Sequence, residues 1–144
     1  TNKFMQFTQT FFIIKPDGVE HLDTILKELT NLGVITRLDR MQSAPRHLLE
    51  EHYANIKDKP FYEETLRYMQ SGPIYLGILS SPYADITKRL RVIVGDTFPS
   101  KADPESLRGR FGKEHGDVVE NVIHASDSDD AADGEIRLWF PKIN

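Results

Sequence analysis

A histidine in the C-terminal part of the chain stands where it could act as a nucleophile. His124 follows the apolar pair Val122-Ile123, and the polar run Ala125-Ser126-Asp127-Ser128 comes directly after it. A strand would hold the imidazole rigidly at its end, next to the backbone N–H groups of a helix start. Because such N–H groups bind anions, this spacing is typical of a histidine that attacks a phosphoryl group.

The other histidines lie among polar or helix-patterned neighbours. They are His21, His47, His52 and His115. A lone histidine is more often a surface residue or a hydrogen-bonded core residue than a catalyst. We therefore expect His124 alone to carry chemistry.

Charge is distributed unevenly around this histidine. The stretch 86–113 holds seven Lys or Arg against three acids, whereas 114–135 holds eight acids and neither Lys nor Arg. The whole chain has 144 residues and a formal charge of only −4, so no general excess of positive charge indicates binding to nucleic acid or to a membrane. A site for an anionic ligand must be local.

Two motifs resemble signatures of the nucleoside diphosphate kinase family. The run Asn121 to Ser128 is similar to the active-site motif of that family, and Ile14-Lys15-Pro16-Asp17-Gly18 is similar to its first-strand motif. Six further motifs follow in family order: His52-Tyr53, Lys59-Pro60-Phe61, Ser71-Gly72-Pro73, Arg91 with Gly95-Asp96-Thr97, Leu107-Arg108-Gly109 and Glu135 to Phe140. The resemblance covers nearly the whole chain.

The resemblance implies a phosphoryl transfer of the ping-pong type. ATP would phosphorylate His124, and the phosphohistidine would pass the group to a nucleoside or deoxynucleoside diphosphate. Mg²⁺ would sit on the nucleotide phosphates, with Asp127 contacting it at most through water. The chain has no Walker-type glycine loop, so side chains would have to cradle the phosphates.

The resemblance also implies roles for individual side chains. The residues that would hold phosphates and sugar are Lys15, Tyr53, Arg91, Thr97, Arg108 and Asn121, and the base would stack on Phe61. Glu135 would orient the imidazole of His124, and Ser126 would link to Glu135. We expect Lys15 and Tyr53 to act with these three as the catalytic set. Without the resemblance, Glu135 would be interpreted as an exposed helix residue and Ser126 as a cap.

The elements that must position these residues alternate between strand and helix. Short β-rich runs predict strands at 11–15, 34–41, 74–79 and 118–125. Apolar spacing predicts helices at 22–32, at 48–56 and 61–68 as a hairpin, at 83–94, and over about ten residues after the cap Ser128, with a loop at 98–104. This order predicts a mixed α/β (α+β) fold. The resemblance specifies a ferredoxin-like βαββαβ fold, with a four-stranded antiparallel sheet covered by helices, in a single domain spanning 1–144.

Composition excludes several classes of protein. The sequence has no cysteine, which excludes disulfide frameworks, thiol catalysis and zinc ribbons and fits a reducing compartment. Its longest apolar runs, such as Phe11 to Ile14, are far shorter than the roughly 20 residues of a membrane helix. We therefore expect a cytoplasmic protein with no membrane contact.

The chain also departs from the family pattern at several positions. Ala125 stands where many members have Gly, Phe98 replaces the usual Asn before Pro99, and Arg110 replaces an acid. About three extra residues precede Asn121, and the region after Val19 is about two residues short. The family's assembly implies a homo-oligomer, a hexamer or alternatively a tetramer, formed partly through the loop 98–104.

Two other functions compete with the kinase. The same sheet topology serves RNA-recognition modules, but neither 11–15 nor 74–79 has the surface aromatics of that class. An interaction protein that had lost catalysis would be expected to have altered His124, Lys15 or Arg108. All three are present.

Overall fold

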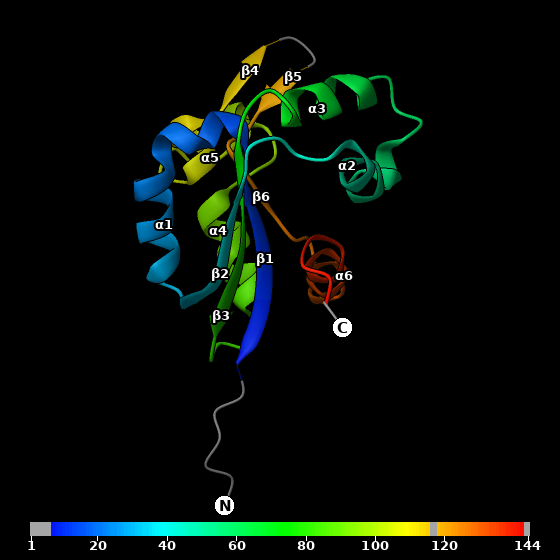
Figure 1. Ribbon diagram of the computed structural model, residues 1–144. Helices are drawn as coiled ribbons and strands as arrows, with labels where there is room; N and C mark the ends of the chain where they lie inside the picture. The colour runs from blue at the N-terminus through cyan, green and yellow to red at the C-terminus, as the bar shows by residue number, and fades with distance from the viewer. Residues whose placement is uncertain (1–6, 116–117, 143–144) are drawn as a thin grey trace, which may run out of the picture.

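A four-stranded antiparallel sheet forms the centre of the molecule (Figure 1). The structure, a computed structural model, describes residues 7–115 and 118–142. The strands of the sheet lie in the order β2-β3-β1-β6, and they are β1 (Thr8–Ile14), β2 (Val34–Met41), β3 (Ile74–Ser81) and β6 (Ile123–Ala125). With the helices between them, this order confirms the expected ferredoxin-like fold.

Helices cover both faces of the sheet. The first face packs against α1 (Leu22–Thr30) and α4 (Ile86–Val94), and the second against α2 (Arg46–His52), α3 (Tyr62–Met69) and α6 (Asp129–Trp139). Figure 1 shows α1 and α4 on one side of β1 and α6 on the other. None of the helices in the described ranges is long and apolar enough to cross a membrane.

Strand β1 supplies apolar side chains to both layers because successive residues of a strand point to opposite faces. Phe12 and Ile14 join the core under α1 and α4, while Phe11 and Ile13 join the core under α2, α3 and α6. All four side chains are fully buried, and each contributes about 1.5–3 kcal/mol of burial free energy. The strand that precedes Lys15 is therefore held by packing on both faces of the sheet.

Two insertions extend the basic βαββαβ plan. The α2/α3 hairpin, with a short 3₁₀ helix η2 (Ala54–Ile56), lies between β2 and β3, as the sequence predicts. A second insertion between α4 and β6 contains η3 (Pro99–Lys101), α5 (Leu107–Phe111) and a two-stranded hairpin of β4 (Lys113–His115) with β5 (Val118–Glu120). The extra residues that we expect before Asn121 fall in the stretch of chain that contains this hairpin.

The prediction of one strand over 118–125 was wrong. The segment divides into β5, which pairs with β4, and β6, which pairs with β1. Val122, between them, has a φ of +62°, which no strand residue can adopt. Sequence periodicity could not show this break because every residue from Val118 to Ile123 except Glu120 and Asn121 favours a strand.

Other boundaries differ by smaller amounts. The expected loop 98–104 contains η3, and α5 was not predicted because its five residues include a glycine. The predicted cap is confirmed, since Ser128 Oγ accepts the N–H of Ala131 at 3.1 Å. A further 3₁₀ helix, η1 (Pro16–His21), continues directly from Lys15.

Candidate active site

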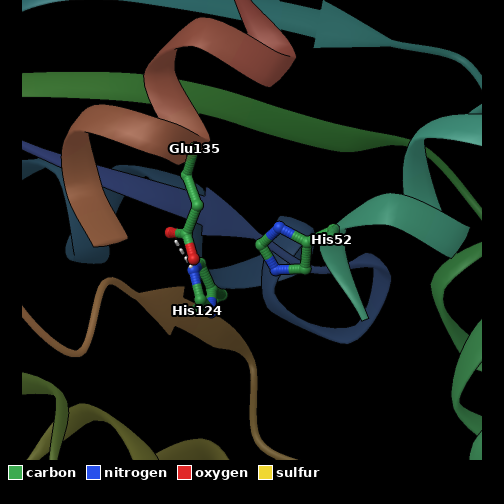
Figure 2. A group of neighbouring side chains, drawn as sticks. All are labelled: His52, His124 and Glu135. Atoms are coloured by element: carbon green, nitrogen blue, oxygen red, sulfur yellow. Dashed lines mark hydrogen bonds and ion pairs between the residues drawn. The ribbon is translucent and has the colours of Figure 1, made fainter. Parts of the chain in front are cut away.

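His124 is the middle residue of β6 and faces Glu135 of α6 (Figure 2). It pairs with Ile13 of β1, so a strand with five consecutive buried residues holds its backbone. Its side chain is 17% exposed, and Nε2 lies 2.7 Å from Oε1 of Glu135. One face of the imidazole is therefore fixed by a carboxylate, while the ring still reaches solvent.

Glu135 receives a second hydrogen bond from the strand side. Ser126 Oγ donates to the same Oε1 at 2.7 Å, as the resemblance implies. Burial raises the pKa of Glu135, but the hydrogen bonds from His124 and Ser126 outweigh it and hold the pKa below its usual value. The resulting carboxylate accepts N–H from Nε2, which leaves Nδ1 of His124 with the free lone pair that a nucleophile requires.

His52, for which we expect no chemistry of its own, packs against the ring of His124. Its ring meets that of His124 edge to face, with centroids 4.5 Å apart, and its Nδ1 accepts the indole N–H of Trp139 at 3.1 Å. Burial, and next the proximity of His124, lower the pKa of His52 to about 3. A neutral ring therefore packs beside His124. The His52-Tyr53 motif was the feature of the sequence that indicated a position near the site.

The amine of Lys15 lies at the end of β1, where Nζ donates to Asn121 Oδ1 at 2.6 Å. The side chain is 8% exposed. Burial and the charge of Arg108 lower the pKa of Lys15 to about 7, against the opposing effect of Asp17. With a pKa of about 7, the free amine of Lys15 is partly protonated in neutral solution, and an anionic ligand would favour its charged form.

Arg108 binds backbone oxygens on both sides of the site. Its guanidinium donates to the carbonyls of Gly95, Asn121 and Ile123, at 3.1, 3.3 and 2.7 Å. Burial and the charge of Arg91 lower its pKa to about 10, so the group stays charged. Arg108 therefore joins the loop after α4 to the strand that carries His124.

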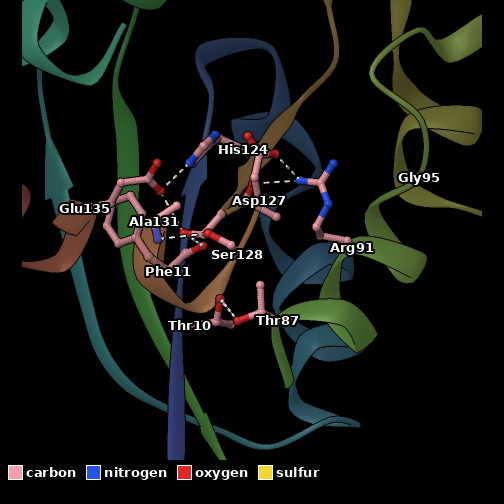
Figure 3. Close-up of polar contacts among 12 residues, drawn as sticks. Thr10, Phe11, Thr87, Arg91, Gly95, His124, Asp127, Ser128, Ala131 and Glu135 are labelled. Atoms are coloured by element: carbon pink, nitrogen blue, oxygen red, sulfur yellow. Dashed lines mark hydrogen bonds and ion pairs between the residues drawn. The ribbon is translucent and has the colours of Figure 1, made fainter. Parts of the chain in front are cut away.

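Arg91 reaches the same strand from α4 (Figure 3). Its Nη1 donates to the carbonyl of Ala125 at 3.1 Å and forms an ion pair of 2.8 Å with Asp127. Thr97 accepts a hydrogen bond from Asn121 Nδ2 through its carbonyl, at 2.9 Å. These contacts connect Arg91 and Thr97 to the segment around His124. Lys15 and Arg108 are connected to the same segment.

The two aromatic residues of the expected set differ in environment. The hydroxyl of Tyr53 is buried and has no hydrogen-bond partner within the described ranges, and burial raises its pKa. Phe61 precedes α3 and is 40% exposed. Tyr53 is therefore an inward-facing donor without an acceptor, while Phe61 offers a ring face to solvent.

Two departures from the family pattern are accommodated locally. Ala125 lies outside the positive-φ region, since Val122 is the sole non-glycine residue with positive φ in the described part of the chain. The methyl group is therefore tolerated at this position. Arg110 forms an ion pair with Glu28 of α1, and Phe98 is 44% exposed.

His124 is backed by a carboxylate, and Lys15, Arg91 and Arg108 bind residues close to it in the chain. This arrangement fits an enzyme that transfers phosphoryl groups. The description of the family model that matches residues 8–144 is nucleoside diphosphate kinase. The chain belongs to this family and is an enzyme that transfers a phosphoryl group between nucleoside tri- and diphosphates. The resemblance seen in the sequence is confirmed.

Relatives and solved structures agree with this assignment. The nucleoside diphosphate kinase of Streptococcus pneumoniae (strain P1031) is 38% identical over 137 residues, covering 92% of this chain and 98% of that protein. The Aquifex aeolicus enzyme has a TM-score of 0.82 at 33% identity, covering 94% of this chain and 96% of that one. The Halobacterium salinarum enzyme, solved in complex with CDP, has a TM-score of 0.84 at 32% identity, covering 95% and 90%.

Proposed function

We propose that this enzyme works by a ping-pong mechanism through a phosphohistidine on His124. ATP or another nucleoside triphosphate donates its terminal phosphoryl group, and a nucleoside or deoxynucleoside diphosphate accepts it. The observation that carries the proposal is the 2.7 Å contact between Nε2 of His124 and Oε1 of Glu135. This contact assigns the proton to Nε2 and leaves Nδ1 to attack.

In the first half-reaction, a bond forms between Nδ1 of His124 and the γ-phosphorus as the bond to the β,γ-bridging oxygen breaks. The nucleoside diphosphate leaves with the electron pair of that bond. In the second half-reaction, the β-phosphate oxygen of the acceptor attacks the phosphohistidine and releases Nδ1. Glu135 stabilises the positive charge that develops on the imidazole, and Ser126 holds Glu135 in place.

We assign the phosphates and sugar to Lys15, Tyr53, Arg91, Thr97, Arg108 and Asn121, and the base to Phe61. A guanidinium has five N–H donors, and Arg108 uses three of them on backbone carbonyls. Two donors therefore stay available for phosphate oxygens. The unpartnered hydroxyl of Tyr53 would gain an acceptor in a bound phosphate.

Mg²⁺ fits this arrangement as a partner of the nucleotide. Asp127 is a hard oxygen donor, its side chain is 83% exposed, and it lies at the site through its ion pair with Arg91. Since Arg91 engages its Oδ1, we assign to Asp127 at most a contact through water. The ion would neutralise the β- and γ-phosphate oxygens, while the chain's own residues position them.

We further propose that residues 1–144 act as one domain within a homo-oligomer, a hexamer or alternatively a tetramer, in the cytoplasm. The exposed ring of Phe98 next to Pro99 supports an interface at the loop 98–104. The absence of cysteine fits a reducing compartment.

The test is direct labelling of the enzyme. Mixing the protein with γ-labelled ATP should give an acid-labile, base-stable phosphoprotein, and adding a diphosphate acceptor should remove the label. His124→Ala should fold normally and take up no label, while His47→Ala, on the exposed side of α2, should label like the parent. Label retained by His124→Ala would refute the assignment.

A further inference from the structure

The turn that leads into the nucleophile's strand has an unusual backbone. Val122, with a φ of +62°, is β-branched, and such residues rarely adopt positive φ. The N–H of Ile123 donates to the carbonyl of Asn121 at 2.7 Å, which closes a three-residue turn around Val122. Turns of this hand are strained, and such strain persists only where the surrounding structure imposes it.

The segment Lys15 to Gly18 imposes this conformation. The N–H of Lys15 donates to the carbonyl of Val122 at 2.9 Å, and the N–H of Val122 donates to Oδ2 of Asp17 at 3.1 Å. A Cβ on Gly18 would lie 2.3 Å from the carbonyl oxygen of Val122. Both peptide groups of Val122 are therefore held by one short segment that begins where β1 ends.

The carboxylate of Asp17 is itself fixed. Its Oδ1 accepts the hydroxyl hydrogen of Tyr68 on α3. Burial, and next the charge of Asp17, raise the pKa of Tyr68, so the hydroxyl remains a donor. The two oxygens of Asp17 thus have separate tasks: Oδ1 binds Tyr68, and Oδ2 binds the strained turn.

The direction of β6 depends on this turn because β6 has three residues and pairs with β1 alone. His124 is the second residue after Val122, so a rotation of the Val122 peptide groups would move its ring relative to Glu135. A misplacement of about 1 Å at a reacting group costs on the order of 100-fold in rate. The conformation of Val122 therefore determines the direction in which the ring of His124 points.

We propose that Asp17 is a positioning residue, whose carboxylate, fixed by Tyr68, holds the Val122 turn and thereby aims His124 at the phosphorus. This inference rests on the proposed function of His124. Asp17 acts through its hydrogen bond to the backbone N–H of Val122, and among the described residues no hydrogen bond or ion pair joins its oxygens to His124 or Glu135.

The experiment compares Asp17→Ala, Asp17→Asn and Asp23→Ala, the last removing an exposed carboxylate of α1. Single-turnover labelling with γ-labelled ATP measures phosphohistidine formation, calorimetry measures ADP binding, and the Val122 amide signal in NMR spectra reports its hydrogen bond. Asp17→Ala should form phosphohistidine about 10- to 100-fold more slowly, bind ADP within about twofold of the parent, and lose amide-exchange protection at Val122.

The amide variant separates hydrogen bonding from charge. In Asp17→Asn, the amide oxygen can accept from Val122 while its NH₂ donates to the hydroxyl of Tyr68. This variant should recover most of the lost rate, and Asp23→Ala should match the parent. A rate for Asp17→Asn as low as that for Asp17→Ala would overturn the hydrogen-bond account.

The remaining outcomes are also decisive. A parent protein that never labels refutes the proposed function, whereas a labelling parent with an equally fast Asp17→Ala refutes this inference alone. Loss of ADP affinity that accounts for the whole rate change would make Asp17 a binding residue and overturn the proposal. If Asp17→Ala does not fold, Tyr68→Phe decides: it should be about 3- to 10-fold slower, and a native rate refutes the proposal.

Discussion

Nε2 of His124 and Oε1 of Glu135 lie 2.7 Å apart and connect the sheet strand β6 to the second turn of α6. Because Ser126 donates to the same oxygen, the carboxylate is anchored from the strand on which the nucleophile sits. Ser126 therefore fixes the position of Glu135 relative to His124.

Removing this carboxylate should slow phosphoryl transfer to His124. A hydrogen bond to a charged group contributes about 1.5–3 kcal/mol, so Glu135→Ala should lower the phosphorylation rate about 10- to 150-fold. Ser126→Ala removes one neutral donor and should cost about 3- to 10-fold. Rapid-quench labelling measures both rates. Equal losses in the two variants would contradict a separate role for the carboxylate.

The depressed pKa of Glu135 also predicts an acid-sensitive fold. Its folded-state pKa lies below the unfolded value, so its stabilising contribution is present above the unfolded pKa and disappears as pH falls through the folded one. Urea unfolding at pH 7 and in mild acid should show a larger acid-induced loss for the parent than for Glu135→Gln. An identical pH dependence in both proteins would refute this.

Because of the titration of Lys15, we expect activity to fall and the free energy of unfolding to rise as pH increases above neutrality. With a folded pKa of about 7 against an ordinary 10.5, the free amine loses its proton near neutrality, so kcat/KM should fall as pH rises through about 7. The unfolded chain binds more protons between these values, so the free energy of unfolding should rise with pH there. Lys15→Met should lose both trends, and Lys88→Met, on the exposed face of α4, should keep them. A fall in kcat/KM at alkaline pH that persists in Lys15→Met would show that another group titrates.

Arg108 should matter for both stability and catalysis. Arg108→Ala should slow transfer about 10²- to 10³-fold. It also removes the guanidinium donor from the carbonyls of Gly95, Asn121 and Ile123, of which Asn121 still accepts the N–H of Ile123. Leaving one buried acceptor without a partner costs about 1–3 kcal/mol, which corresponds to a fall in Tm of about 4 to 12 °C. Arg91→Ala, which removes one backbone contact, should lower Tm less. Calorimetry tests this order, and equal Tm values would contradict it.

The sequence predicts the chemistry of this site better than its geometry. His124, Ser126 and Glu135 lie within one short stretch, and the resemblance of its motifs to those of the family identifies them together. The Val122 turn depends on Asp17, 105 residues earlier, and local propensity at a valine between strand-forming residues indicates a strand. The position of His52 beside His124 could not be predicted from the local pattern, because its contact with Trp139 crosses 87 residues. Likewise, the backbone role of Arg108 depends on a fold that places Gly95 and Ile123 on either side of it.

Base selectivity should be low. Phe61 presents an exposed ring face, and stacking tolerates any base. The other residues of the set are assigned to phosphates and sugar. ADP, GDP, CDP, UDP and their deoxy forms should be accepted with efficiencies within about two orders of magnitude. A preference above about 10⁴ for one base in competition assays would show that the insertion before Asn121 supplies contacts to base edges.

Light scattering should report a homo-oligomer. Phe98, 44% exposed in the single chain, is the aromatic that we expect an interface to cover, so Phe98→Ala should weaken the assembly. Val92→Ala, an exposed apolar residue of α4, serves as the comparison. A stable, active monomer of the parent protein would refute the prediction.

The pairing of His124 with Ile13 has a consequence for the protein's synthesis on the ribosome. β1 is translated well before β6, so β6 can dock only after the residues that separate the two strands have also been made. Glu135 emerges later still, with α6. Since domains fold as units once their residues are available, we expect nascent chains to remain catalytically silent until α6 has left the exit tunnel, and ribosomes stalled before Glu135 to carry chains that leave ATP untouched.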